Sequence, residues 1–269
     1  MDDVRVDAYL RRIGVPRPTV LDAAALKTLH RAHLVAVPFE NLSIHLGEQI
    51  SLDADALFDK IVTRRRGGFC YELNGSFAML LGALGASVAM LSAKVHGPRG
   101  LGPPFDHLAL LVDIGDGVSR LCDVGFGNHS TYPLAFDERG DQSDPGGVFR
   151  ILDVDNGDVN VVRDASPQYR AERRHRDLSE FGPTCWWQQT SPDSHFTQST
   201  ICSRLTEDGR VSISGRQVIR TEDGVRKLRT IEDDDALLEA YRDLFGVELD
   251  RVPIVASPER TRRPSSVSA

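Results

Sequence analysis

Cysteine is scarce in this sequence, with four residues in 269 and no Cys-x-x-Cys pair among them. The cysteines lie far apart, at Cys70, Cys122, Cys185 and Cys202. This spacing argues against a zinc site and against a disulfide framework, and we expect no metal. Free thiols are typical of proteins in a reducing compartment, so the sequence predicts a cytoplasmic location.

The sequence also lacks long hydrophobic runs and an excess of basic residues. No uninterrupted apolar stretch approaches membrane-spanning length, and the charged start of the chain has no apolar core of a signal peptide. The formal net charge of −7 gives no basic footprint for nucleic acid. We therefore expect no membrane partner and no nucleic-acid partner, and the sequence leaves open whether the chain forms homo-oligomers.

The segment 66–74, Arg-Gly-Gly-Phe-Cys-Tyr-Glu-Leu-Asn, stands between two predicted helices. Upstream, apolar residues recur at helical spacing at Ala54, Leu57, Phe58, Ile61 and Val62. The arginines at 64–66 and the glycines at 67–68 are expected to end this helix. A second apolar face follows at Leu73, Phe77, Leu80, Leu81 and Leu84. The pattern places Cys70 in the first turn of a new helix.

Two interpretations of Cys70 fit this local pattern. A thiol at a helix start lies near unpaired backbone N–H groups and the positive end of the helix dipole, which favours the thiolate and therefore a nucleophile. An isolated cysteine is also commonly a small buried core residue. The segment alone does not decide between them.

A nucleophilic thiol needs a base and a group that orients the base. His107 begins an apolar strand after a Gly/Pro-rich loop, and the Gly-Asp-Gly turn at 115–117 folds the next strand back beside it. Asp123 then comes opposite His107 within about one register step. Taken singly, His107 fits an ordinary core histidine and Asp123 a turn acid. Together with Cys70 they favour a papain-like Cys-His-Asp triad.

Other polar residues have simpler interpretations. His30 and His33 lie three residues apart on a helical stripe, and without a third ligand we expect a surface or core role rather than metal binding. Glu40, in Val-Pro-Phe-Glu-Asn-Leu at 37–42, can accept from an arginine of 64–66 and so hold this loop against the Cys70 helix, or can lie exposed on a turn.

The hydrophobic period divides the chain. Residues 1–86 have mainly helical spacing, and from residue 87 a period of two predicts strands, including one over 118–124 and a hairpin around Asp155-Asn156-Gly157. This middle section is expected to form a small antiparallel sheet or barrel. Residues 181–196 read as irregular. Two more hairpins, at 206–209 and 221–224, precede a helix over 233–245, and the Pro-, Ser- and Arg-rich tail over 253–269 is expected to be disordered.

Six short motifs, taken together and in order, resemble those of the arylamine N-acetyltransferase family over nearly the whole chain. Two are the segments 37–42 and 66–74 already described. The next two are His-Leu-Ala-Leu-Leu-Val at 107–112 and Asp-Val-Gly-Phe-Gly at 123–127. The last two are Thr-Ser-Pro-Asp-Ser-His-Phe at 190–196 and Cys-Ser-Arg-Leu-Thr-Glu-Asp-Gly at 202–209. Each motif is weak alone, but the ordered set is highly specific.

The resemblance implies an α+β fold with a cysteine-protease-like triad core. Its parts would be a helical N-terminal domain (1–86) with Cys70, a central antiparallel β-barrel (87–196) with His107 and Asp123, and a C-terminal α/β lid (197–252). It implies that the acceptor pocket is lined by Phe39, Val95, Phe126 and Phe196. It further implies that Gly125, Phe126 and Gly127 lie beside the cofactor, and that Glu40 and Arg66 brace the active-site loops.

The activity implied by the resemblance is a two-step acyl transfer. Acetyl-CoA, a co-substrate, would acetylate Cys70, and a small arylamine, arylhydroxylamine or hydrazine would then accept the acetyl group. The residues Asn128 and His129 differ from those of some relatives and leave acceptor preference open. The chain also lacks a long insertion that some relatives carry after the barrel, which favours the more open cleft of the bacterial type.

Three other functions remain possible from the sequence. The same triad would serve an amide synthase that closes a macrolactam, or a relative of cysteine proteases and transglutaminases. A catalytically silent binding homologue is the alternative outside enzymes. The preferred acyl chain, the physiological acceptor and the residues that hold the phosphates of CoA carry no signature in the sequence.

Overall fold

Helices dominate the first part of the chain, as the apolar spacing predicts. The computed structural model describes residues 1–98 and 100–255. Its first helices are α1 (Asp3–Ile13), α2 (Ala23–Ala36), α3 (Leu42–Leu46), α4 (Ala54–Phe58) and α5 (Cys70–Ala83), with a turn of π-helix, η1 (Asp59–Thr63), directly after α4. The side chains of Asp2 and Asp22 accept backbone N–H bonds at the starts of α1 and α2.

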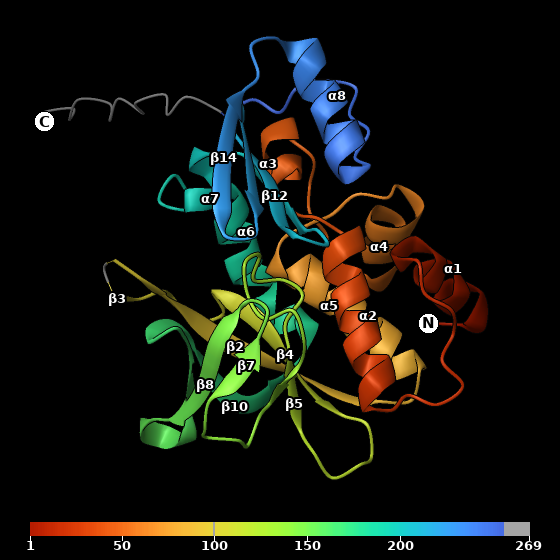
Figure 1. Cartoon of the computed structure of the whole chain (residues 1–269), viewed down its shortest axis with the longest axis vertical. Helices are drawn as coiled ribbons and strands as arrows, with labels where there is room; N and C mark the ends of the chain where they lie inside the picture. The colour runs from red at the N-terminus through yellow and green to blue at the C-terminus, as the bar shows by residue number, and fades with distance from the viewer. Residues whose placement is uncertain (99, 256–269) are drawn as a thin grey trace, which may run out of the picture.

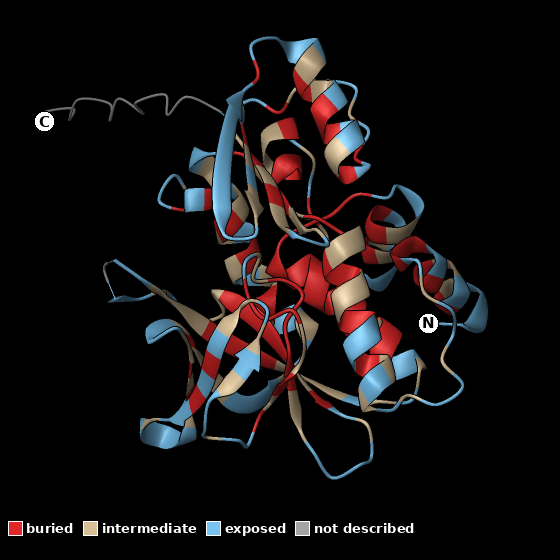
Figure 2. Cartoon of the chain, viewed as in Figure 1, coloured by how far each residue is buried: buried red, intermediate tan, exposed pale blue. Residues whose placement is uncertain are grey.

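The helix α5 lies at the centre of the fold. It packs against α1 and α4 and, on the barrel side, against β2 and β4 (Figure 1). Most of its residues are buried, so that it appears as a red core element in Figure 2. Because α5 is apolar on nearly every side, it can fill this position between the other helices and the sheet.

The middle of the chain forms an antiparallel sheet that curls into a nearly closed barrel. Its strands run in the order β6-β5-β4-β2-β10-β9-β8-β7, with the short β3 paired to β2. Their bounds are β2 Ser87–Gly97, β3 Gly100–Leu101, β4 His107–Asp113, β5 Arg120–Cys122, β6 Leu134–Ala135, β7 Gln142–Asp144, β8 Gly147–Asp153, β9 Val159–Arg163 and β10 Ser166–Arg176. A separate apolar cluster, which includes Phe149 and Tyr169, fills its interior. The predicted α+β class and antiparallel barrel are confirmed.

A second antiparallel sheet lies above the barrel in Figure 1, in the order β1-β11-β12-β13-β14. Its strands are β1 (Phe39–Glu40), β11 (Ile201–Leu205), β12 (Gly209–Ser214), β13 (Gln217–Glu222) and β14 (Val225–Thr230), followed by α8 (Asp234–Phe245). The hairpins expected at 206–209 and 221–224 and the helix expected over 233–245 are present. Strand β1 comes from the helical part of the chain, so this sheet joins two distant segments.

Three local predictions were wrong or incomplete. Residues 181–196 are not irregular: after η3 (Leu178–Phe181), they contain α6 (Gly182–Thr190), which has a proline in its first turn, and the start of α7 (His195–Gln198). The strand expected over 118–124 is restricted to β5, because the next backbone N–H bonds a helix side chain instead of a strand. The long β10, rich in arginine, was not predicted as a strand.

None of the helices in the described ranges is long and apolar enough to cross a membrane. The expected disordered tail at 253–269 falls mostly on residues 256–269, which lie outside the described residues.

Candidate active site

Cys70 is the first residue of α5, and the backbone leading to it passes through a tight gap. A Cβ added at Gly67 would lie 1.9 Å from the carbonyl oxygen of Pro38, so only glycine fits there. The N–H of Phe69 donates to Glu72 Oε2 at 3.2 Å, which satisfies one backbone donor at the helix start. These contacts fix the backbone before Cys70 and therefore the position of its side chain.

His107 and Asp123 form a buried pair on the barrel side of α5. His107 Nε2–H donates to Asp123 Oδ2 at 2.7 Å, and the two side chains are 3% and 1% exposed. Pairing of Leu110 with Cys122 sets the register of β4 and β5. In this register Asp123 lies two residues from the position directly opposite His107, a diagonal neighbour rather than the opposite residue expected from the turn.

The carboxylate of Asp123 is held from α5 by Asn74. Asn74 Nδ2 donates to Asp123 Oδ1 at 2.9 Å and to the Leu108 carbonyl at 2.6 Å, while its Oδ1 accepts from Val124 N–H at 2.9 Å. Gly125 N–H also donates to Asp123 Oδ1, at 3.1 Å. The acid therefore has hydrogen-bond partners on both oxygens, which a buried carboxylate needs.

The charge states of the site follow from burial and neighbours. Burial alone would raise the pKa of Asp123, but the charge and hydrogen bond of His107 outweigh it and hold that pKa below its usual range. Burial raises the pKa of the Cys70 thiol well above its ordinary value, and the charges of Asp106 and Asp123 add to this. Burial therefore acts against the thiolate that the helix start is expected to favour.

Cys70 and His107 both line one pocket. Within the described residues, Cys70 Sγ has a long contact of 4.0 Å with the Asp106 carbonyl oxygen, and no hydrogen bond joins it to His107. The ring leaves Nδ1 as the nitrogen opposite the bond to Asp123. A substrate in the pocket would lie beside both groups, and such bonds commonly tighten only when substrate is bound.

The pocket has a volume of about 370 Å³ and contains most of the residues expected at the site. Those lining it include Phe39, Cys70, Val95, Asp106, His107, Gly125, Phe126 and Phe196. Gly127 is not among the residues that line the pocket. A Cβ added there would be 3.7 Å from the ring of Phe39, which does line it. The structure thus brings together Cys70, the His107–Asp123 pair and the four expected apolar residues.

The predicted bond between Glu40 and the arginines of 64–66 is made by Arg66. Arg66 Nε donates to Glu40 Oε1 at 3.0 Å, and Nη2 lies 2.9 Å from the same oxygen in this ion pair, whose side chains are 5% and 0% exposed. Glu40 Oε2 accepts from Leu42 N–H at 2.6 Å. The pair joins β1 to the segment before Cys70, which fits a bracing role.

Sequence reasoning overlooked two contacts at the site. Asn74 follows Cys70 by one helical turn, so its place on the same face was available from the spacing alone. His30, buried on α2, bonds the backbone of Asp123 across a separation of 93 residues, and no local pattern predicts such a contact. Of the surface and core roles expected for His30 and His33, the structure shows the core role, because both are fully buried.

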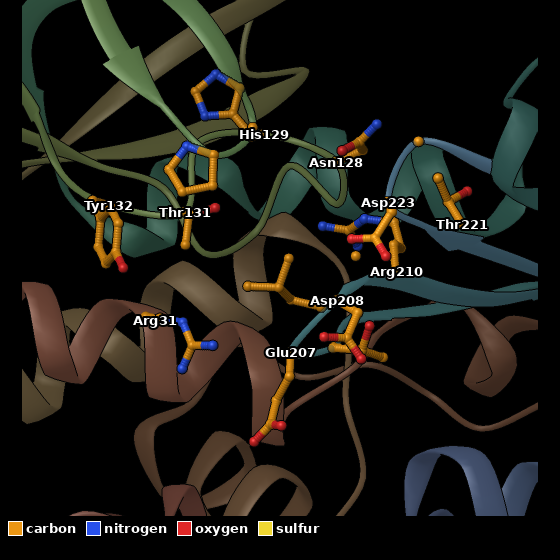
Figure 3. Close-up of a pocket in the computed structure, with 16 residues that line it drawn as sticks. Arg31, Asn128, His129, Thr131, Tyr132, Glu207, Asp208, Arg210, Thr221 and Asp223 are labelled. Carbon is orange, nitrogen blue, oxygen red and sulfur yellow. The ribbon is translucent and has the colours of Figure 1, made fainter. Parts of the chain in front are cut away.

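A second cavity, of about 620 Å³, lies between the barrel and the second sheet. Figure 3 shows its walls: Arg31 on α2, the loop from Asn128 to Tyr132, and residues such as Arg210 and Asp223 on the hairpins. Arg210 Nη1 donates to Ser203 Oγ at 3.1 Å, and the same cavity is also lined by Glu207, Asp208 and Asp223. Burial and nearby Arg163 lower the pKa of Arg210 to about 10.

Comparison with known proteins identifies the family. A family model described as N-acetyltransferase matches residues 22–254. The arylamine N-acetyltransferase / N-hydroxyarylamine O-acetyltransferase of Salmonella typhimurium is 32% identical over 256 residues, covering 91% of this chain and 89% of that protein. The arylamine N-acetyltransferase of Mycolicibacterium smegmatis is also 32% identical, over 255 residues that cover 90% and 91% of the two chains.

Solved structures agree. The arylamine N-acetyltransferase of Mycobacterium marinum superposes with a TM-score of 0.83 at 31% identity and covers 90% of this chain and 92% of that one. A structure of the same Mycobacterium marinum enzyme in complex with CoA is also similar, with a TM-score of 0.83 at 30% identity over 90% and 92% of the two chains. The chain therefore belongs to the arylamine N-acetyltransferase family of acyltransferases.

Proposed function

We propose that this chain transfers the acetyl group of acetyl-CoA to arylamines, arylhydroxylamines or hydrazines through an acetyl-Cys70 intermediate. The observation that carries the proposal is the single pocket shared by Cys70 and His107, with Asp123 bonded behind the ring. A thiol, a base and a buried acid that orients the base are the parts that covalent acyl transfer requires. The activity named for the relatives supports the choice of donor and acceptor.

In the first half-reaction Cys70 is the nucleophile. Burial raises the pKa of this thiol, and in the proposed step its proton passes to His107 Nδ1 as Sγ attacks the thioester carbonyl. The carbonyl carbon–sulfur bond to CoA breaks, CoA takes the proton from the imidazolium and leaves as a thiol, and acetyl-Cys70 remains. Asp123 stabilises the transient imidazolium and keeps the ring oriented.

In the second half-reaction the acceptor nitrogen attacks acetyl-Cys70. Neutral His107 takes a proton from that nitrogen, the bond between the acetyl carbon and Sγ breaks, and Sγ regains a proton from the imidazolium. The side chains of Phe39, Val95, Phe126 and Phe196 would bind a flat apolar acceptor, since aromatic rings pack in offset or edge-on contacts.

The donor would extend from this pocket toward the second cavity. Three segments line both spaces: the loop from Gly125 to His129, the strand β11 and the strand β12, whose Ser214 faces the thiol pocket and whose Arg210 faces the second cavity. Gly125, Phe126 and Gly127 would then lie beside the pantetheine arm. Arg210, which lines the second cavity, is the cation we assign to the phosphates of CoA.

Mass spectrometry of the intact protein tests the proposal. Brief incubation with acetyl-CoA should add one acetyl group at Cys70, and a following addition of a simple aniline should remove it and yield the acetanilide. Cys70→Ser should fold normally and lose nearly all turnover. A Ser variant with substantial activity would contradict the nucleophile assignment. Retained alkylation of Cys70 without any acetyl transfer would favour an amide synthase instead.

A further inference from the structure

The loop from Asp123 to Thr131 carries both the acid of the site and part of the pocket wall. Strand β5 ends at Cys122, so the backbone N–H of Asp123 has no partner in the sheet. The loop then passes Gly125 and Phe126 at the pocket before it reaches Thr131. Its two ends must be held together for Asp123 to keep its position behind His107.

One side chain bonds both ends of this loop. His30 lies on α2 and is fully buried. Its Nδ1 is 2.9 Å from the carbonyl oxygen of Thr131, and its Nε2 is 3.1 Å from the backbone nitrogen of Asp123. A carbonyl can only accept and a backbone N–H can only donate, so Nδ1 carries the proton and Nε2 accepts. Both ring nitrogens of neutral His30 are thereby satisfied.

The imidazole of His30 makes hydrogen bonds that a neighbouring strand would otherwise make with this backbone. It supplies an acceptor where β5 stops and a donor where the loop returns, so the backbone of Asp123 is held from α2 while Asn74 holds its carboxylate from α5. Because its backbone is held from one helix and its carboxylate from another, Asp123 has little freedom to rotate away from the His107 ring. The buried position excludes water as a substitute partner.

We propose that His30 is a positioning residue for acyl transfer: by closing the 123–131 loop it sets the place from which Asp123 orients His107. This inference rests on the proposed function for its main measurement, although the orientation of His107 has a second measurement that needs no acetyl-CoA. Neither ring nitrogen of His30 contacts the pocket, so its effect on rate passes through Asp123.

Two amide variants of His30 each keep only one of its two hydrogen bonds, so they test the bond to Asp123 and the bond to Thr131 one at a time. In His30→Gln the amide oxygen reaches the position of Nε2 and can still accept from Asp123 N–H. In His30→Asn the shorter amide reaches only the position of Nδ1 and can bond Thr131 but not Asp123. We expect His30→Gln to keep most of kcat and His30→Asn to lose up to about a hundred-fold, because small misplacements of catalytic groups have effects of that size. KM for the acceptor should change little.

The neighbouring His33 provides a matched control. It lies on the same helix, is equally buried, and bonds the hydroxyl of Tyr9 at 3.0 Å rather than the loop. His33→Asn should therefore lower thermal stability without lowering kcat of the folded enzyme. The result that overturns the proposal is a folded His30→Asn with the kcat of the wild type, or equal losses of kcat in His30→Asn, His30→Gln and His33→Asn.

A second measurement keeps the two proposals distinguishable. Alkylation of Cys70 by iodoacetamide, located by peptide mass spectrometry, depends on the orientation of His107 but not on acetyl-CoA. His30→Asn should be alkylated more slowly than His30→Gln at the same pH. If this difference appears while the wild type transfers no acetyl group, the positioning role stands and the proposed function fails. If the wild type transfers acetyl groups while neither His30 variant falls below His33→Asn in either assay, the positioning role is wrong.

Discussion

Replacing Arg66 with methionine should destabilise the fold strongly, because the buried carboxylate of Glu40 loses its ion-pair partner. The guanidinium of Arg66 donates from Nε to Glu40 Oε1 and forms an ion pair with it, and further contacts reach Glu48 Oε2 and Ser43 Oγ, both at 3.3 Å. Methionine keeps an unbranched apolar stem but lacks the guanidinium, so Glu40, which is 1% exposed, loses this partner.

The size of the effect follows from the burial of the pair. Breaking a buried ion pair by removing one partner costs roughly 3–5 kcal/mol. For a domain of this size each kcal/mol lowers the unfolding midpoint by about 2–4 °C. We therefore expect Arg66→Met to unfold roughly 6–20 °C below the wild type.

The effect should also depend on pH. Burial would raise the pKa of Glu40, but the charges of Arg66 and Lys60 outweigh it and hold that pKa below its ordinary value. A carboxylate with a lowered folded-state pKa stabilises the fold above its unfolded-state pKa, and this stability is lost as pH falls through the folded-state value. In Arg66→Met, the free energy of unfolding should lack the loss on acidification that comes from Glu40.

Thermal and denaturant unfolding, followed by circular dichroism from neutral to acidic pH, measures both effects. Glu40→Gln/Arg66→Met removes the stranded charge and should recover part of the loss. Arg150→Met, which removes one partner of an exposed pair with Asp141, should leave the midpoint unchanged. An Arg66→Met midpoint within a degree or two of the wild type, on the order of 1 kcal/mol or less, would refute the reasoning.

Three further changes test the site. Gly125→Ala places a Cβ 2.7 Å from Asn74 Nδ2 and 2.8 Å from the Cα of Cys70, so it should push the loop off α5 and lower the acylation rate at least about ten-fold. Stopped-flow acylation with acetyl-CoA measures it, and an unchanged rate would contradict the close packing. Asp106→Asn removes a charge that raises the pKa of Cys70, so alkylation at neutral pH should become faster rather than slower. Arg210→Met should raise KM for acetyl-CoA but not for an acetyl thioester that lacks the adenosine phosphates, and equal KM changes for both donors would exclude the assigned phosphate contact.

Features set by neighbouring residues were predictable from the sequence. The start of α5 at Cys70 follows from the glycines before it and the apolar face after it, and the β4–β5 hairpin follows from the turn at 115–117. The same turn did not determine the register to the residue, so the diagonal placement of His107 and Asp123 needed the structure. Pairing of β1 with β11 joins Phe39 to Ser203, and no local period encodes a contact of such separation.

The pKa of the Cys70 thiol depends on more than the sequence around it. A helix start favours a thiolate through nearby N–H groups, and this effect can be inferred from sequence. Burial acts in the opposite direction and depends on how the barrel covers α5, which the sequence does not display. At 4% exposure, burial raises the pKa of Cys70 well above its ordinary value, against the effect of the helix start.

The acid of the site is held by helices although it belongs to the barrel. Strands β4 and β5 bring His107 and Asp123 near each other, but the bonds that fix Asp123 come from Asn74 on α5 and His30 on α2. Asn74 is on the same helix as Cys70, so a shift of α5 moves the nucleophile and the carboxylate's anchor together. Because one rigid helix sets both positions, the geometry between thiol, ring and acid can be preserved even when the open side of the pocket adapts to different acceptors.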